Sequence, residues 1–315
     1  MDVVARDRTQ VTVLMTAFNA GGYLSVAIQS LLRQSLSDWK LILVDNGSTD
    51  DSVSSLKLED SRIQIFRFAA NVGRTQALQF ALTQSGTPFT AVLDADDVAH
   101  PNRLSQQLSS LELSDDLVLV GSHVTSLIDG DVCLPKLNEV VGTISHDQLA
   151  ERNPFVHSSV MFRTSAALTS GGYDDKYPYA QDYDLFQKLA LIGRCSILPS
   201  QLTGLRIHPK SITRNQTFVL QRLTDELHLS QLAAARLQLS PLGVRLNRRR
   251  QALVHLELAY NELLSGRILS GLKNLAFGVK IDPTMSWILY LLRGRPYPKA
   301  LNQSLVTHQS DACGL

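Results

Sequence analysis

An apolar run that begins at Phe89 ends in three closely spaced carboxylates, those of Asp94, Asp96 and Asp97. Carboxylates grouped in one loop are suited to a hard divalent cation that keeps part of its water shell and shares the phosphates of a ligand. A diphosphate is therefore the expected ligand. The alternative is structural, because acidic loop residues also cap helices, and a helix is expected to begin near Pro101.

Two further carboxylates, Asp182 and Asp184, stand at the start of a segment with helical spacing. Apolar residues follow Asp182 at positions i+3, i+4 and i+7. This spacing predicts that Asp182 lies on the inward face of a helix and that Asp184 points elsewhere. Asp182 can also be the N-cap of this helix, and the two roles are compatible. The apolar residues that define the face are Leu185, Phe186 and Leu189.

Two common phosphate-binding motifs are absent from the sequence. There is no GxxxxGK[ST] segment, and no GxGxxG follows the first expected strand, which weighs against ATP hydrolysis and against hydride transfer with a nicotinamide cofactor. The three cysteines, Cys133, Cys195 and Cys313, are widely spaced and form no CxxC pair. Neither a disulfide framework nor a zinc site is expected, and a reducing cytoplasm fits best.

Length and composition are those of an ordinary folded protein. The chain has 315 residues, of which 44% are hydrophobic and 19% charged, and a chain of this length is expected to form about two domains. Its apolar runs, such as 287–292, are too short to cross a bilayer, and no signal peptide is recognised at the start. The expected location is the cytoplasm, at the inner face of the membrane if the C-terminal part binds lipid.

The elements that must position these carboxylates alternate between short apolar runs and segments of helical spacing. This alternation predicts a mostly parallel sheet covered by helices, in which ligands bind at the carboxyl ends of the strands. Asp45 ends one of these strands and Asp94 another. The expected strands are 11–16, 40–45, 62–68 and 89–94, and the expected helices are 25–34, 50–58, 75–84 and 101–111.

The chain changes character near residue 215. Two strand-like stretches, 196–198 and 204–208, close an expected first domain of residues 1–215, which carries 18 basic and 23 acidic side chains and a charge of −5. Residues 216–315 carry 12 basic and 6 acidic side chains, a charge of +6. This region is expected to be helical at 218–239, 244–264, 267–279 and 284–292, with breaks at Pro241, Gly266 and Pro283.

Five segments occur in an order that resembles the signatures of the family 2 glycosyltransferases. The resemblance spans about residues 11–210 and implies the A-type glycosyltransferase fold, an α/β fold that binds nucleotide sugars. The segments are Thr12-Val-Leu-Met-Thr-Ala-Phe-Asn, Leu43-Val-Asp-Asn-Gly-Ser-Thr-Asp, Asn71-Val-Gly-Arg, Leu93-Asp-Ala-Asp-Asp and Ala180-Gln-Asp-Tyr-Asp-Leu.

The resemblance assigns a nucleotide site to the first four segments. It implies that Thr16 and Phe18 lie beside the base, that Asp45 binds its uracil edge, and that Arg74 lies near the nucleotide. These roles are chemically sound, since a carboxylate accepts from an imide N–H and an aromatic ring stacks on a base. Without the resemblance, Phe18 would be interpreted as a core residue and Asp45 as a turn residue. Asp94 and Asp96 form the DxD motif, in which Asp96 binds Mn²⁺ or Mg²⁺.

The resemblance also suggests an acid–base group. Asp182 occupies the position of the general base in this family. His208 occupies a position near the diphosphate, where it would contact the metal or a phosphate. A lone histidine at such a position can also be structural. His157 is a weaker candidate for the acceptor side and is interpreted as a hydrogen-bonded core residue. The sequence departs from the usual pattern at Phe18, where tyrosine is common, at Asn46, where a second aspartate is common, and at Gln181, where an acidic residue is common. Loss of charge at Asn46 is expected to loosen nucleotide specificity.

The function implied by the resemblance is a metal-dependent, inverting transfer of a sugar from a nucleotide diphosphate donor, UDP-linked, to a hydroxyl on a glycan or lipid-linked acceptor. A sugar-phosphate nucleotidyltransferase is the first alternative, although Ala20-Gly21-Gly22 is a poor triphosphate loop. A non-catalytic glycan- or partner-binding relative is the second. The basic helical region is expected either to pack on the first domain or to contact a membrane surface or a protein partner, and no nucleic-acid partner is expected.

Overall fold

The structure of the protein, a computed structural model, describes residues 9–56, 59–128, 131–133, 141–208 and 218–282. The chain divides into two compact units, one formed by residues 1–149 and 153–209, the other by residues 150–152 and 210–315. Each unit has a hydrophobic core of its own. The boundary expected at residue 215 and the helix expected at 284–292 lie outside the described residues.

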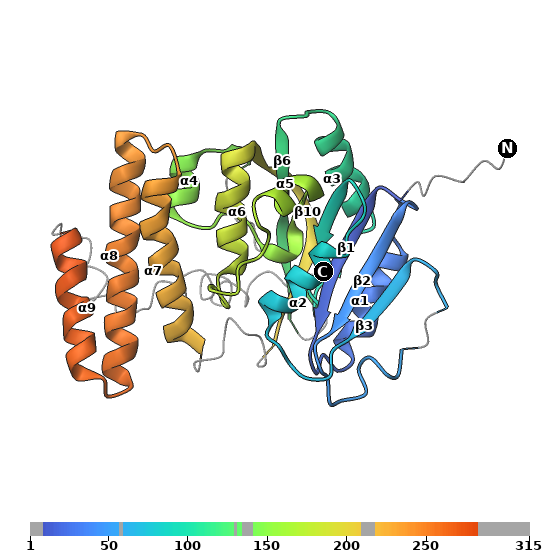
Figure 1. Ribbon diagram of the computed structural model, residues 1–315, viewed down its shortest axis with the longest axis horizontal. Helices are drawn as coiled ribbons and strands as arrows, with labels where there is room; N and C mark the ends of the chain where they lie inside the picture. The colour runs from blue at the N-terminus through green and yellow to red at the C-terminus, as the bar shows by residue number, and fades with distance from the viewer. Residues whose placement is uncertain (1–8, 57–58, 129–130, 134–140, 209–217, 283–315) are drawn as a thin grey trace, which may run out of the picture. The chain divides into compact units, whose positions relative to one another are not determined.

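Among the described residues, a ten-stranded sheet forms the first unit (Figure 1). Eight strands follow the order β3-β2-β1-β4-β9-β6-β10-β5, while β7 pairs with β6 and β8 pairs with β10. Strands β3, β2, β1 and β4 are parallel, as is the long pair β6 and β10, and β9 joins the two parts by antiparallel pairing with β4 and β6. The strands are β1 (Val11–Ala17), β2 (Trp39–Asp45), β3 (Ile63–Arg67), β4 (Phe89–Val92), β5 (Val98–Ala99), β6 (Leu117–Ile128), β7 (Asp131–Cys133), β8 (Gly142–Ile144), β9 (Met161–Arg163) and β10 (Arg194–Ile207).

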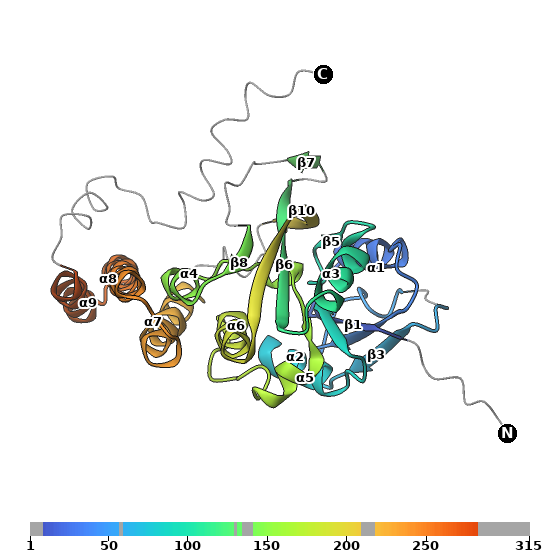
Figure 2. The ribbon, with the colours of Figure 1, turned by 90° about the horizontal axis from the view of Figure 1, so that it is seen from above.

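Helices cover both faces of the sheet, which explains why its central strands are buried on both sides. Figure 2 shows α1 and α3 on one face and α2, α5 and α6 on the other. Almost every side chain of β1 and β2 is buried, as the uninterrupted apolar runs predicted. The helices are α1 (Tyr23–Leu32), α2 (Arg74–Thr83), α3 (Arg103–Glu112), α4 (His146–Glu151), α5 (Thr164–Thr169) and α6 (Gln181–Ile192), with a 3₁₀ turn η1 (His157–Ser159).

The fold class predicted from the sequence is confirmed, with local differences. Residues 50–56, expected to be helical, form turns instead. The cause is local, because the carboxylate of Asp50 accepts hydrogen bonds from the backbone N and the hydroxyl of Ser52 and so competes with helix formation. The two strand-like stretches at 196–198 and 204–208 belong to one strand, β10, whose pairing with β6 is interrupted by bulges.

Three helices form most of the described second unit: α7 (Val219–Arg236), α8 (Pro241–Leu264) and α9 (Ile268–Ile281). Helix α8 begins at Pro241 after the N-cap Ser240, whose hydroxyl accepts from the N–H of Gly243. Helices α7 and α8 share a core of Leu223, Val254 and Leu258. None of the described helices combines the length and apolar character needed to span a bilayer.

Candidate active site

The carboxyl ends of β1, β2 and β4 lie at one edge of the sheet, because these strands are parallel neighbours. Ala17 of β1 stands opposite Asp45 of β2, and Leu14 opposite Val92 of β4. Phe18, Asp45 and Asp94 therefore reach the same edge from strands that are far apart in sequence. This is the part of an open α/β sheet where ligands bind.

The three carboxylates after β4 lie close enough together to share a cation. One carboxylate oxygen from each of Asp94, Asp96 and Asp97 lies within 4.8 Å of the others. The turn is held from below by Ser158, whose hydroxyl oxygen accepts from the backbone N of Asp94 at 2.8 Å and whose proton goes to Asp97. Each carboxylate has different further partners, and these partners separate their roles.

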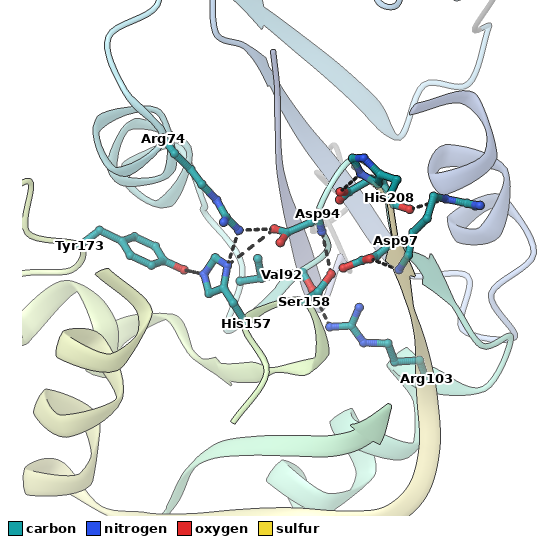
Figure 3. A network of polar contacts seen from close by, with 11 residues as sticks. Arg74, Val92, Asp94, Asp97, Arg103, His157, Ser158, Tyr173 and His208 are labelled. Carbon is teal, nitrogen blue, oxygen red and sulfur yellow. Dashed lines mark hydrogen bonds and ion pairs between the residues drawn. The ribbon is translucent and has the colours of Figure 1, made fainter. Parts of the chain in front are cut away.

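Asp94 belongs to a chain of polar contacts that crosses the site (Figure 3). Nη2 of Arg74 donates to Oδ1 of Asp94 at 2.5 Å and to Nδ1 of His157 at 3.0 Å. Because a guanidinium can only donate, Nδ1 of His157 accepts, and its proton lies on Nε2, 2.9 Å from the hydroxyl oxygen of Tyr173. Burial opposes ionisation, yet the charge of Arg74 holds the pKa of Asp94 well below its usual range.

Asp97 is the most buried of the three, with 2% of its surface exposed. Its Oδ1 accepts from the backbone N of Arg206 at 2.9 Å. Burial, together with the charges of Asp94 and Asp96, raises the pKa of Asp97 to about 8. Asp97 is therefore largely protonated at neutral pH and joins β10 to the loop after β4, in addition to any ligand role.

A buried guanidinium lies behind this loop. Arg103 of α3 donates from Nη2 to the carbonyl oxygens of Val92 and Val160, at 2.6 and 3.0 Å, at the point where β4 ends and β9 is about to begin. Burial lowers the pKa of Arg103 to about 10, so it keeps its charge at neutral pH. It thereby fixes the strand junction that carries the three carboxylates.

Asp96 pairs with His208, the other residue that is expected to contact the metal. Nε2 of His208 lies 2.9 Å from Oδ2 of Asp96, and both side chains are partly exposed. The ring of His208 packs on the ring of Tyr23, and the guanidinium of Arg206 also lies over the Tyr23 ring. Nε of Arg206 donates to the backbone oxygen of Asp96. The donor set at this point, a carboxylate beside an imidazole with two more carboxylates nearby, fits a divalent cation.

Arg74 is positioned by the loop that precedes α2. Asn46 donates from Nδ2 to Oδ1 of Asn71 at 3.0 Å, and its Oδ1 accepts from the backbone N of Val72 at 3.0 Å. Oδ1 of Asn71 also accepts from the backbone N of Gly73 at 2.8 Å. Asn46 is buried, so its first contribution is to hold this loop. That its missing charge loosens nucleotide specificity stays a prediction.

Asp182 lies at the same site. Its Oδ2 accepts from Nδ2 of Asn153 at 3.2 Å. Burial lowers the pKa of Arg74, but the charges of Asp94, Asp182 and Asp96 outweigh burial and raise it. The charge of Asp182 therefore acts on the guanidinium that binds Asp94, which links the last sequence segment to the first four.

Asp184 corrects the expectation that it points away from the packed face of α6. Its side chain is 0% exposed, and its carboxylate pairs with Nζ of Lys188 at 2.6 Å. The spacing argument assumed one buried face, whereas α6 is packed around most of its circumference. Nζ of Lys188 also donates to the carbonyl oxygen of Gly172 at 3.1 Å. Asp184 thus anchors the loop that carries Tyr173.

The residues expected beside the base lie along the ends of β1 and β2. Thr16 is half-buried in β1, and Phe18, the residue after this strand, is 49% exposed. A side chain that stacks on a base must be exposed, whereas a core residue is buried. Asp45 is buried; its Oδ1 accepts from the backbone N of Ser48 at 2.9 Å, and its Oδ2 lies 3.9 Å from Nε of Arg67. One oxygen of Asp45 is therefore used by the turn.

The interpretation of His157 as a hydrogen-bonded core residue is confirmed, since its side chain is 7% exposed and contacts Arg74 and Tyr173, but sequence reasoning missed Tyr173. Their contacts join residues that are distant along the chain, since His157 is 83 positions from Arg74. Tyr173 follows Gly171-Gly172, where Nε2 of Gln79 donates to the carbonyl of Gly171 and Oε1 of Gln79 accepts from the N–H of Tyr173. The paired glycines marked a loop, but nothing in their spacing pointed to a ring buried against the site.

The fold is the A-type fold of glycosyltransferases, as two solved structures show. A mannosyltransferase, PcManGT from Pyrobaculum calidifontis in complex with GDP-Man and Mn²⁺, superimposes with a TM-score of 0.61 at 15% identity, covering 91% of this chain and 79% of that chain. Residues 1–349 of S. aureus TarS in complex with UDP superimpose with a TM-score of 0.56 at 14% identity, covering 84% and 89%.

The sequence comparisons name the family. The family model described as Glycosyl transferase family 2 matches residues 12–167, just under half of the chain. An uncharacterized glycosyltransferase of Haemophilus influenzae is 26% identical over 212 residues, which cover 63% of this chain and 65% of the relative. The O-antigen biosynthesis glycosyltransferase WbnJ of Escherichia coli is 27% identical over 215 residues, covering 65% and 82%. The matched region thus spans just under two thirds of the Haemophilus relative.

Proposed function

We propose that the protein transfers a sugar from a UDP-linked donor to a hydroxyl of a glycan or lipid-linked acceptor, with inversion at the anomeric carbon, in the synthesis of a polysaccharide or glycoconjugate. The relative WbnJ is named for O-antigen biosynthesis, and a further relative in Escherichia coli is named as a glucosyltransferase that uses UDP-Glc and a diphosphoundecaprenol-linked acceptor. These names support the donor and acceptor classes.

The observation that carries the proposal is the position of Arg74 between two motifs. Its guanidinium binds Asp94 of the DxD segment and lies in the field of Asp182, the expected general base. A donor diphosphate near the carboxylates after β4 would thus place its sugar close to Asp182. Asp182 would take the proton of the attacking hydroxyl, and attack in line with the departing diphosphate inverts the anomeric centre.

Asp96 and His208 would hold a divalent ion, Mn²⁺ or Mg²⁺. When bound, the ion would offset negative charge that develops on the departing diphosphate. The complex of PcManGT with Mn²⁺ supports this proposal, as does the carboxylate cluster of this chain. Asp94 and Asp97 shape the same turn, one through Arg74 and the other through Ser158 and Arg206.

The acceptor side is supported by a hollow of about 460 Å³ between α2, the loop at 171–175 and α6. Its lining is rich in groups that hydrogen-bond to hydroxyls, among them Gln76, Asp174 and Asp175. Tyr173 belongs both to this lining and to the contacts around His157. A saccharide is the ligand class that such a lining suits, because each sugar hydroxyl can donate and accept.

The proposal is tested by donor turnover and by calorimetry. Release of UDP from a panel of UDP-sugars, measured with and without Mn²⁺, is expected to require the metal. A nucleotidyltransferase would instead consume a nucleoside triphosphate and release pyrophosphate.

In titrations with UDP, Mn²⁺ is expected to strengthen binding by about tenfold or more in the native chain, as removal of a metal contact typically costs that much. Asp96→Ala should lose this dependence. Asp115→Ala, which removes a fully exposed carboxylate on the same unit, should keep it. Equal metal dependence in Asp96→Ala and the native chain would remove Asp96 from the metal site.

A further inference from the structure

Helix α9 has an unusual charge distribution. From Gly266 to Ile281 the chain carries three basic residues, Arg267, Lys273 and Lys280, and no acidic residue. The same stretch contains seven of the larger apolar side chains. A helix of this composition at the surface combines cationic and apolar character without the anionic groups that usually accompany lysines in a solvated face.

The two characters are sorted around the helix. Its two glycines face α8: a Cβ at Gly271 would meet Leu263, and one at Gly278 would meet the carbonyl of Ala252 and the side chain of Leu256. At 100° per residue, the opposite face is centred on Leu269 and Ala276. Lys273 and Lys280 lie along one side of that centre. The residues along its other side are Ile268, Leu272, Leu275 and Val279.

This outward face is exposed in the described part of its own unit. Leu269 is 79% exposed, Ile268 61% and Leu272 51%. In both Figure 1 and Figure 2, α9 lies beyond α8 on the side away from α7. Exposed apolar side chains grouped along one face, rather than scattered, mark an interaction surface.

Charge identifies the partner. A second copy of this face, placed against the first by a two-fold axis, would bring the same cations together, with Asp282 at the end of each helix as the one acidic residue of this segment. The remaining chain, 283–315, has three basic residues and one acidic residue, so it offers no complementary charge either. A lipid surface with anionic headgroups over an apolar interior can contact both the apolar side and the lysine side of α9 at the same time.

We propose that the outward face of α9 binds an anionic lipid surface, with Leu269 and its apolar neighbours entering the headgroup boundary and Lys273 and Lys280 contacting phosphate groups. This interaction is independent of the proposed transfer reaction, because the residues that carry it lie outside the active-site unit. It would deliver the enzyme to the surface where lipid-linked acceptors are found.

The test is co-sedimentation of the full chain with vesicles. Binding is expected to vesicles of mixed phosphatidylcholine and phosphatidylglycerol at low salt and to be lost with phosphatidylcholine alone. Leu269→Glu places a carboxylate at the centre of the face and should weaken binding by about tenfold or more. Leu113→Glu makes the same change at a leucine of the first unit that is 86% exposed, and should change binding less than about twofold.

The contribution of the charges is measured separately. Each of Lys273→Gln and Lys280→Gln should weaken binding to the anionic vesicles by about fivefold. Absence of binding by the native chain, equal binding to both vesicle types, or equal binding by Leu269→Glu and Leu113→Glu would overturn the proposal. So would a native dimer in sedimentation that Leu269→Glu converts to monomer while vesicle binding is absent, since that outcome identifies a second copy as the partner.

Discussion

Two carboxylates two positions apart in α6 have different surroundings, and the difference assigns them different work. Asp182 is partly exposed, and its charge acts on the guanidinium of Arg74. Asp184 is wholly buried against Lys188. We therefore expect the first, which reaches solvent, to receive the proton of a substrate hydroxyl, whereas the second holds the packing of α6 against the loop at 171–173.

We expect Asp182→Asn to bind UDP and Mn²⁺ about as well as the native chain and to turn over at least ~100-fold more slowly, the usual cost of removing a general base. The measurement is single-turnover UDP release beside calorimetric titration of the same preparation. Retained turnover in Asp182→Asn would exclude it as the base.

Asp184→Asn is the matched substitution and should act on stability. It leaves Lys188 partly buried without its ionic partner, which we expect to lower the free energy of unfolding by about 2 kcal/mol, less than for a fully buried pair because Lys188 reaches solvent. Turnover by the folded fraction should stay within a few-fold of native. If Asp184→Asn instead slows the chemical step more than Asp182→Asn does, the two roles are exchanged.

A buried glutamate in α8 makes stability depend on pH. Glu257 is 3% exposed, and within the described part of the chain its Oε1 has no hydrogen-bond partner. Burial raises the pKa of Glu257 from 4.5 to about 7. Between these values the folded chain keeps a proton that the unfolded chain releases, so this group favours the folded state less and less as the pH rises through that window.

Glu257→Gln removes the titration while keeping the shape of the side chain. Relative to the native chain, the variant should gain up to about 3 kcal/mol at pH 8 and little at pH 4. Hydrogen exchange of α8 amides, compared at equal pH, measures the gain. Glu112→Gln, at an exposed glutamate, is the control. A pH-independent gain would show that packing, not ionisation, is responsible.

At the scale of elements, the turn after β2 and the loop before α2 form one supporting structure. Gly47 has a φ of +77°, and a Cβ there would lie 2.6 Å from the carbonyl carbon of Ala70 and 2.7 Å from the N of Asn71. Because Asn71 is bonded to Asn46 and precedes Arg74, a displacement at Gly47 reaches the guanidinium that binds Asp94.

Gly47→Ala is therefore expected to lower the free energy of unfolding by about 3 kcal/mol, part from the left-handed backbone and part from the clash, and to weaken UDP binding. Gly266→Ala separates the two causes, since Gly266 has the same φ of +77° but open space around its Cβ position. It should cost only about 1 kcal/mol and leave UDP binding unchanged. Thermal melts and calorimetry give both quantities. Equal effects of the two substitutions would leave the supporting role of the turn unsupported.

The strands could be predicted well because their burial on both faces demands uninterrupted apolar runs, as in β1 and β2. Helix faces were harder. The periodicity of α6 predicted that Asp182 faces inward but misplaced Asp184, since a helix packed on most sides has no polar face to detect. Residues 50–56 were expected to be helical, and the bond of Asp50 to Ser52 decided otherwise.

At the scale of the whole molecule, two separate cores predict two unfolding transitions. One core is built on the sheet and the other on Leu223, Val254 and Leu258. In calorimetry, UDP with Mn²⁺ at about 100 times its dissociation constant should stabilise only the transition of the first unit, by about 2.7 kcal/mol. Glu257→Gln should shift only the other transition. A single transition that both changes move would show that the units unfold together.

Residues that meet only in the fold mark the limit of prediction at this scale. The order of five segments predicted the architecture, and the strand ends predicted where Asp45 and Asp94 would meet. The contacts from Arg74 through His157 to Tyr173 bring together three segments that are far apart in the sequence, and no local spacing predicts them. The contacts of Asn46 with Asn71 and Val72 could likewise not be predicted, because the residue type indicates only that a charge is missing and not which backbone groups it binds.

The pairing of the three carboxylates after β4 has a kinetic consequence. Arg74 neutralises Asp94, and Asp97 holds its proton below a pKa of about 8. Asp96 lies beside the imidazole of His208, at 2.9 Å, so the trio as a whole carries little net negative charge. Such a site attracts a lone divalent ion weakly, whereas a diphosphate brings negative charge of its own. We therefore expect the cation and the nucleotide to bind as one preformed complex, and the metal site to be empty and of low net charge between turnovers.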